Sequence, residues 1–78
     1  MTRRYFNFVM ARKDRVLPEG TYTENHHIIP DSWGGPKEDW NMVRLTAREH
    51  YIAHKMLARE FPQDCSALKA FGYMCASN

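Results

Sequence analysis

One helix boundary constrains this chain more than any other feature of its sequence. Segment 46–49 (TARE) fits the S/T-x-x-E capping box, in which Thr46 caps the amide of Glu49 and the glutamate reaches back to the threonine. The predicted helix runs over 47–60, and Pro62 stops it. A chain of 78 residues has room for one domain with a marginal core, so this helix must form much of that core. Its core candidates are Tyr51, Ile52, Met56 and Leu57.

The rest of the pattern predicts a mixed α+β fold. Residues 3–15 favour a helix, with an apolar face made of Tyr5, Phe6, Val9 and Met10. A β-rich stretch follows over 21–29 and ends at Pro30. Residues 31–40 read as an irregular loop with a sharp reversal at Gly34-Gly35, and 42–45 as a second strand, which together predict an antiparallel hairpin. A last helix is expected after Asp64. Trp33 and Trp40 bracket the glycine loop and are expected to pack over it.

Composition narrows the class of protein. Apolar residues make up 44% of the chain and charged residues 26%, which is ordinary for a globular protein and excludes a disordered one. No signal peptide or membrane span is recognisable, so we expect an intracellular, soluble protein without a membrane partner. Cys65 and Cys75 lack metal-ligand spacing and are interpreted as buried, reduced thiols.

The formal net charge of +2 is weak evidence for a polyanionic partner, and its distribution says more. Residues 1–15 carry five cations against one acid, which we interpret as a solvated helix face rather than a DNA clamp. A second basic set is expected beside the histidines described next, and it consists of Arg44, Arg48, Lys55 and Arg59.

All four histidines lie in two tight groups. His50 and His54 are one helical turn apart, so they project from one face of the predicted helix and can bind one metal ion. His26 and His27 are adjacent in a strand and point to opposite faces, so one of them can join the helical pair while the other faces elsewhere. Three protein ligands leave an ion with an open position, as in catalytic sites.

Such a set has a definite chemistry. An ion with an open position can bind a phosphoryl oxygen and stabilise a leaving alkoxide, and a free imidazole can take a proton from water near neutral pH. The alternative is a closed structural site, for which Cys65 or Glu49 could be the fourth ligand. The capping box already uses Glu49, and Cys65 lies beyond the helix stop, which weakens that alternative.

The multi-part pattern resembles the HNH endonuclease family, especially phage-type and homing-type members, and its helical histidine pair is similar to that of colicin-type DNases. The resemblance covers about residues 20–62 within a single domain of residues 1–78. It rests on four segments in order: ENHHIIP at 24–30, GG at 34–35, NMVRLT at 41–46 and EHYIAH at 49–54.

The resemblance implies a ββα-metal fold with flanking helices, and a metal-dependent endonuclease that hydrolyses DNA phosphodiester bonds. By the same resemblance His27 is the general base, Asn41 holds the loop and orients His27, and Glu24 can assist. It further implies that His26, His50 and His54 bind one divalent ion. Because imidazoles suit zinc, nickel or manganese better than magnesium, the identity of the ion stays open among these four.

Two further expectations concern the partner. Arg44 and Arg48 flank the histidines and, with Lys55, are candidates for binding DNA phosphates. A rival hypothesis is a catalytically inert HNH-fold module that uses the metal as a staple and binds nucleic acid or a protein. Retention of His27 and Asn41 argues against it, because a staple needs only the ligands.

Overall fold

The structure, a computed structural model, describes residues 3–64 of the chain. In chain order the elements are helix α1 (Arg3–Met10), strand β1 (Glu24–His27), the 3-10 turns η1 (Asp31–Trp33) and η2 (Asp39–Asn41), strand β2 (Met42–Leu45) and helix α2 (Ala47–Glu60). The predicted α+β class is therefore confirmed, and the order β1, β2, α2 is compatible with a ββα motif preceded by a helix. The helix predicted after Asp64 and the two cysteines lie outside the described residues.

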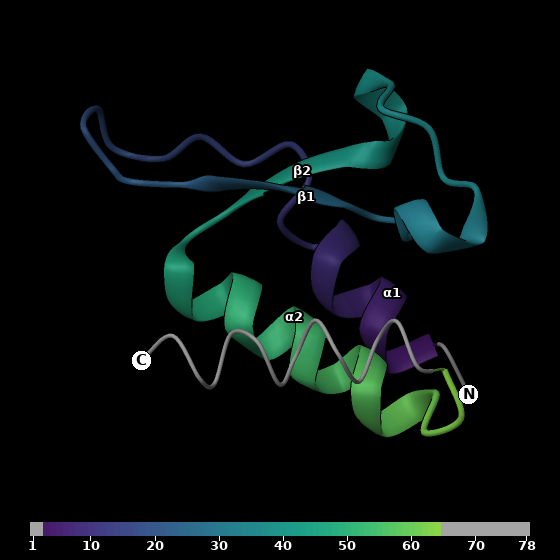
Figure 1. Cartoon of the computed structure of the whole chain (residues 1–78). Helices are drawn as coiled ribbons and strands as arrows, with labels where there is room; N and C mark the ends of the chain where they lie inside the picture. Colours follow the sequence, from purple (N-terminus) through teal and green to yellow (C-terminus); the bar gives the residue numbers. More distant parts are fainter. Residues whose placement is uncertain (1–2, 65–78) are drawn as a thin grey trace.

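The two strands form an antiparallel hairpin that lies over the two helices as a separate layer (Figure 1). Glu24 pairs with Leu45 and His26 with Val43, and these four positions face the helices. Asn25 and His27 therefore share the opposite, outer face with their partners on β2, because successive strand residues alternate between faces. No helix within residues 3–64 is long and apolar enough to span a membrane.

The core lies between the inner face of the hairpin and the two helices. Tyr5 and Val9 on α1, one turn apart, are both fully buried against it. The other buried apolar members are Ile28, Val43, Leu45, Ala53 and Leu57. Two polar side chains are buried with them: His26, at 3% exposure, and Asn41, at 0%. Two buried polar side chains in so small a core indicate where the candidate functional site lies.

Helix α1 is shorter than predicted. It ends at Met10 instead of continuing to residue 15, and the chain goes on in tight turns in which Arg12 and Lys13 bond to carbonyls three residues back. Met10 is 53% exposed and does not belong to the apolar face. A long-range contact explains the early end, because the Arg12 guanidinium bonds both to the Phe8 carbonyl and to Glu49 on α2.

Helix α2 has the predicted bounds, and its capping box is complete. Glu49 N donates to Thr46 Oγ1, and the Thr46 amide donates back to the Glu49 carboxylate. That carboxylate also forms ion pairs with Arg15 and Arg12. The hydrogen bond from Arg15 first, and then those from the Thr46 amide and from Arg12, hold the pKa of Glu49 down at about 2. These two cations of the basic N-terminal segment therefore fasten it to α2 and do not form a merely solvated face. Of the predicted core residues of α2, Leu57 is buried, whereas Tyr51, Ile52 and Met56 are half-buried.

The strand β1 and the loop after it also differ from prediction. Only Glu24–His27 of the β-rich stretch pair, because β2 has four residues and Thr46 then begins the helix cap. The loop contains η1 and η2, so it is not wholly irregular. Trp33 packs edge-on against Phe61 beyond α2 rather than over the glycines, and Trp40 is 58% exposed, so the expected packing over the loop is wrong.

The predicted reversal at the two glycines is confirmed. Gly34 has φ +85°, a left-handed conformation that favours glycine. Gly35 is buried against the chain at Ile29, and a Cβ at Gly35 would lie 1.9 Å from the Ile29 carbonyl oxygen. The close approach brings the loop back onto the end of β1.

Candidate metal centre

Three imidazoles converge between the hairpin and α2. His26 comes from the inner face of β1, and His50 and His54 come from one face of α2. Each offers a nitrogen, and the three nitrogens lie within 4.8 Å of one another. The ring centroids are 4.7–5.2 Å apart. Among residues 3–64 this is the group of side chains placed to hold a metal ion. Of the two adjacent histidines, His26 is therefore the one that joins the helical pair.

The His26 ring is held by a tyrosine from the first helix. Tyr5 Oη lies 2.6 Å from His26 Nε2 and donates to the backbone carbonyls of Ile28 and His27 at 2.8 Å and 3.2 Å. Because the hydroxyl has a single proton and directs it to these carbonyls, it accepts from a protonated Nε2 of His26. The Nδ1 lone pair of His26 is then free to face the other two rings.

The His50 ring is held in the same way by a carboxylate. His50 Nδ1 lies 2.7 Å from Glu24 Oε1, and Tyr22 donates to Glu24 Oε2 at 2.7 Å. A carboxylate accepts only, so Nδ1 of His50 carries the proton and Nε2 is free. The hydrogen bonds from Tyr22 and then His50 lower the pKa of Glu24, which stays ionised. This is the carboxylate–histidine pairing that orients metal ligands in proteins.

The third ring completes the group of nitrogens. His54 Nε2 lies 3.1 Å from His50 Nε2, and His54 Nδ1 is buried without a hydrogen-bond partner within residues 3–64. Burial and the neighbouring His50 lower the pKa of His54 to about 4. Burial, followed by the charges of His54, His50 and His27, lowers the pKa of His26 to about 3. Both rings are neutral at neutral pH.

These residues fit a divalent transition metal. Neutral imidazoles are ligands that suit zinc and nickel, and three of them leave a coordination position open. The hydrogen bonds that His26 and His50 donate to Tyr5 and Glu24 set the tautomers of the two imidazoles in the form that a ligand needs.

The histidines open into a cleft of about 330 Å³. His27, which faces the outer side of the sheet, reaches its rim and lines it together with the metal-binding candidates. Its ring forms no hydrogen bond with residues 3–64. Asp31, Ser32 and Asp64, which the sequence analysis did not single out, also line the cleft.

Asn41 holds the loop, as the resemblance implies. Its Oδ1 accepts from the Ile29 amide at 2.7 Å, and its Nδ2 donates to the carbonyls of Ile29 and Pro36 at 3.1 Å and 2.9 Å. The Asn41 carbonyl also accepts from the Ile28 amide. Within the described residues none of its bonds reaches the His27 ring. Any effect on His27 therefore passes through the backbone that follows it.

The three candidate phosphate-binding residues do not lie together. Arg44 is exposed on the outer face of β2, where its Nε bonds to Thr23 Oγ1. Arg48 and Lys55 line a hollow on another side of α2 with Arg59. At about 100° per residue, these positions are turned away from His50 and His54, so the expectation that they flank the histidines is wrong.

Tyr5 is the main site residue that sequence analysis missed. The helical spacing identifies it as a core residue, which is correct, since it is fully buried. Its hydroxyl, however, contacts a residue 21 positions away, and no local pattern reveals that contact. The one available signal is a general rule, that a buried tyrosine hydroxyl finds a partner.

Comparison with known proteins shows relatives among phage proteins. The chain is 41% identical over 73 residues to probable mobile endonuclease E of Enterobacteria phage T4, a match that covers 94% of this chain and 51% of that protein. It is 48% identical over 61 residues to probable mobile endonuclease D of the same phage, covering 74% and 24%. An uncharacterized 38.5 kDa protein in psbA intron 1 of Chlamydomonas moewusii is 40% identical over 52 residues, covering 67% and 15%.

These matches cover only part of each relative's length. The chain spans about half the length of one of these relatives and a quarter or less of the other two. No protein-family model matches the chain, and no solved structure matches it. The similarity therefore concerns most of this chain but only a part of the phage proteins that are named as probable mobile endonucleases.

Proposed function

We propose that this chain is the nuclease part of a metal-dependent HNH endonuclease that hydrolyses DNA phosphodiester bonds in the cytoplasm of a phage-infected host. The observation that carries the proposal is the convergence of His26, His50 and His54 on a cleft that His27 also lines. The similarity to phage proteins named as probable mobile endonucleases supports the same class of activity.

In this proposal the three inner histidines bind the ion, and the outer one, His27, accepts a proton from the attacking water. A divalent ion held by His26, His50 and His54 would supply positive charge to a phosphoryl oxygen and to the leaving alkoxide. His27, with no hydrogen-bond partner for its ring among residues 3–64, takes the proton from the attacking water. Its separation from the inner face leaves it free to act as a base while its neighbour His26 serves as a ligand.

The supporting residues fix this arrangement. Tyr5 and Glu24 set the ring orientation of His26 and His50, so Glu24 acts on a ligand rather than on the attacking water. Asn41 fastens the chain directly after His27 to the returning loop, which limits movement of the base. Such positioning matters because proton transfer needs the base within hydrogen-bond reach of the water.

The test is cleavage of supercoiled plasmid by metal-stripped protein, with Mg²⁺, Mn²⁺, Ni²⁺ or Zn²⁺ added back and EDTA as control. We expect nicking that requires an added ion and that is lost in His27→Ala, while this variant still binds one ion. Full cleavage by His27→Ala would refute the role of that residue. Absence of cleavage with every ion, in protein that binds one, would favour the inert metal-stapled module instead.

A further inference from the structure

A second hollow is lined by three outward-facing residues of the hairpin, Asn25, Met42 and Arg44. It has a volume of about 660 Å³ and is formed where the segment after α1 passes beside the two strands. Five cations and one carboxylate line it: Arg12, Lys13, Arg15, Lys37, Arg44 and Asp39. We call it the basic hollow.

Three of the five cations keep their charge available. Arg12 and Arg15 are ion-paired with Glu49 and are structural. Lys13 Nζ donates to the Asp39 backbone carbonyl at 2.7 Å, which leaves its charge unneutralised. Arg44 likewise bonds to hydroxyl and not to carboxylate oxygen. Lys37 is exposed and its side chain forms no hydrogen bond or ion pair with residues 3–64.

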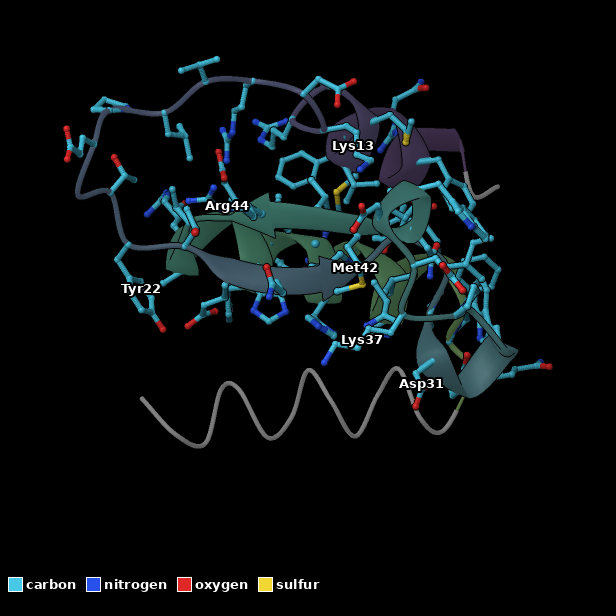
Figure 2. All side chains as sticks on the ribbon, turned by 90° about the horizontal axis from the view of Figure 1, so that it is seen from above. Lys13, Tyr22, Asp31, Lys37, Met42 and Arg44 are labelled. Carbon is cyan, nitrogen blue, oxygen red and sulfur yellow. The ribbon has the colours of Figure 1, made fainter. Side chains whose placement is uncertain are left out.

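The basic hollow adjoins the histidine cleft. Asn25 lines both, and it stands opposite Arg44 in the strand register. The next outward pair is His27 with Met42, and Met42 also lines the hollow. Figure 2 looks down on this surface, with Lys13, Lys37 and Arg44 set around Met42. Arg44 therefore shares the outer face of the sheet with the proposed general base, and Lys13 and Lys37 line the same hollow as Arg44.

We propose that the basic hollow binds the phosphate backbone of duplex DNA beside the bond that is cut, through Lys13, Lys37 and Arg44. The inference rests on the proposed function and specifies its DNA-binding surface. Backbone contacts of this kind supply most of the non-specific affinity for DNA and set the position of the protein on it. A DNA strand that leaves the histidine cleft past Asn25 enters this hollow directly, because Asn25 lines both.

The other basic surface is the competing choice, and geometry argues against it. Arg48, Lys55 and Arg59 gather on α2, but that part of the helix surface is turned away from His50 and His54. A phosphate held there lies on the other side of α2 from the cleft. Both basic surfaces complement the charge of DNA, but only the basic hollow is continuous with the histidine cleft, through Asn25.

The experiment measures binding without cleavage. A fluorescently labelled 20-base-pair duplex is titrated with the full chain in EDTA, and the affinity is followed by anisotropy as salt is raised. The variants are Lys37→Gln and the double variant Lys13→Gln/Lys37→Gln, with Arg59→Gln as a control of the same charge change on the opposite surface. Circular dichroism verifies that each variant is folded.

Each lysine that neutralises one phosphate contributes about 0.9 to the slope of log affinity against log salt. We expect Lys37→Gln to reduce the slope by about one and the double variant by about two, with a smaller change in Arg59→Gln. Lys37→Gln is decisive by itself, because Lys37 has no structural contact within residues 3–64 to lose. An unchanged slope in Lys37→Gln, or an equal fall in Arg59→Gln, would overturn the proposal.

Two further outcomes separate this inference from the proposed function. Lysine-dependent binding in a chain that cuts no DNA would support the surface and refute the nuclease. Metal-dependent cleavage with DNA binding that is indifferent to Lys13 and Lys37 would refute the surface alone. Displacement of the duplex by an acidic peptide of equal total charge, with the same lysine dependence, would identify an acidic protein partner and also overturn the proposal.

Discussion

Strands β1 and β2 have equal length and pair residue for residue, yet they turn different side chains toward the helices. β2 contributes Val43 and Leu45, which are 2% and 0% exposed and belong to the core. β1 contributes His26 and Glu24 at the paired positions: His26 belongs to the candidate metal centre, and Glu24 bonds to its member His50. One strand anchors the hairpin by apolar burial, and the other supplies residues of the candidate site.

The difference between the strands shows how a small domain can place polar site residues at positions that face its core. β1 buries little apolar side chain of its own, so it depends on pairing with β2 and on hydrogen bonds at its C-terminal end. Tyr5 bonds to the carbonyls of His27 and Ile28, and Asn41 bonds to the backbone of Ile29. Both groups are fully buried. Substitutions in the two strands should therefore have different consequences.

The largest effect is expected from Leu45→Ala in β2. Removing this buried side chain should cost roughly 2–5 kcal/mol of unfolding free energy, whether or not a metal is present. The measurement is urea denaturation with EDTA and with added Zn²⁺. His26→Leu in β1 is the matched comparison, since it should abolish the stabilisation by Zn²⁺ while changing metal-free stability less. Equal losses in the two variants would contradict the division of labour between the strands.

Next in size is Asn41→Ala, which removes the clamp on the end of β1. The substitution leaves the Ile29 amide and the carbonyls of Ile29 and Pro36 without their partner, which should cost about 2–3 kcal/mol. Urea denaturation gives the loss, and hydrogen exchange at the Ile29 amide should accelerate with it. Unchanged protection at that amide would show that the loop is held by something else.

A smaller effect on stability is expected from Tyr5→Phe. The variant keeps the ring and loses one buried hydroxyl, so metal-free stability should fall by about 1 kcal/mol. Metal affinity should fall by roughly 10- to 100-fold, because His26 loses the bond that sets its tautomer. Val9→Ala, in the same buried face of α1, is the control: it should lower stability and leave the Co²⁺ spectrum and affinity of the folded protein unchanged. The same affinity in Tyr5→Phe as in the native chain would make Tyr5 a core residue only.

The smallest effect is expected from Glu24→Gln. The amide oxygen can still accept from His50 Nδ1, but without the charge, so metal affinity should fall by about tenfold. Titration of Co²⁺ into each protein measures this, with the exposed Glu19→Gln as the matched control. A fall in cleavage rate with unaltered metal affinity would instead place Glu24 at the reacting water.

Local signals in the sequence predict the parts of the fold that depend on near neighbours. The capping box at Thr46 and Glu49 gives both bounds of α2 with Pro62, and the four-residue spacing places His50 and His54 on one face. The position of Arg48 was also predictable, because about 100° per residue turns its side chain away from His50 and His54. Closeness in sequence was a misleading guide to closeness in space on this helix.

The rest depends on contacts between distant segments. Strand alternation alone leaves open which of His26 and His27 faces the helices; the family resemblance implies His26, and the strand register places His26 on the inner face. The early end of α1 follows from the bonds of Arg12 and Arg15 to Glu49, more than thirty positions away. Tyr5 reaches His26 only because α1 packs under the hairpin.

Isothermal titration of Zn²⁺ into the metal-stripped chain and into His26→Leu, with urea denaturation of both, decides whether the inner face of β1 takes part in metal binding. We expect one ion per native chain, no specific binding by His26→Leu, and a native-like metal-free fold in that variant. If His26→Leu instead bound one ion with native affinity, the inner face of β1 would not form the metal centre.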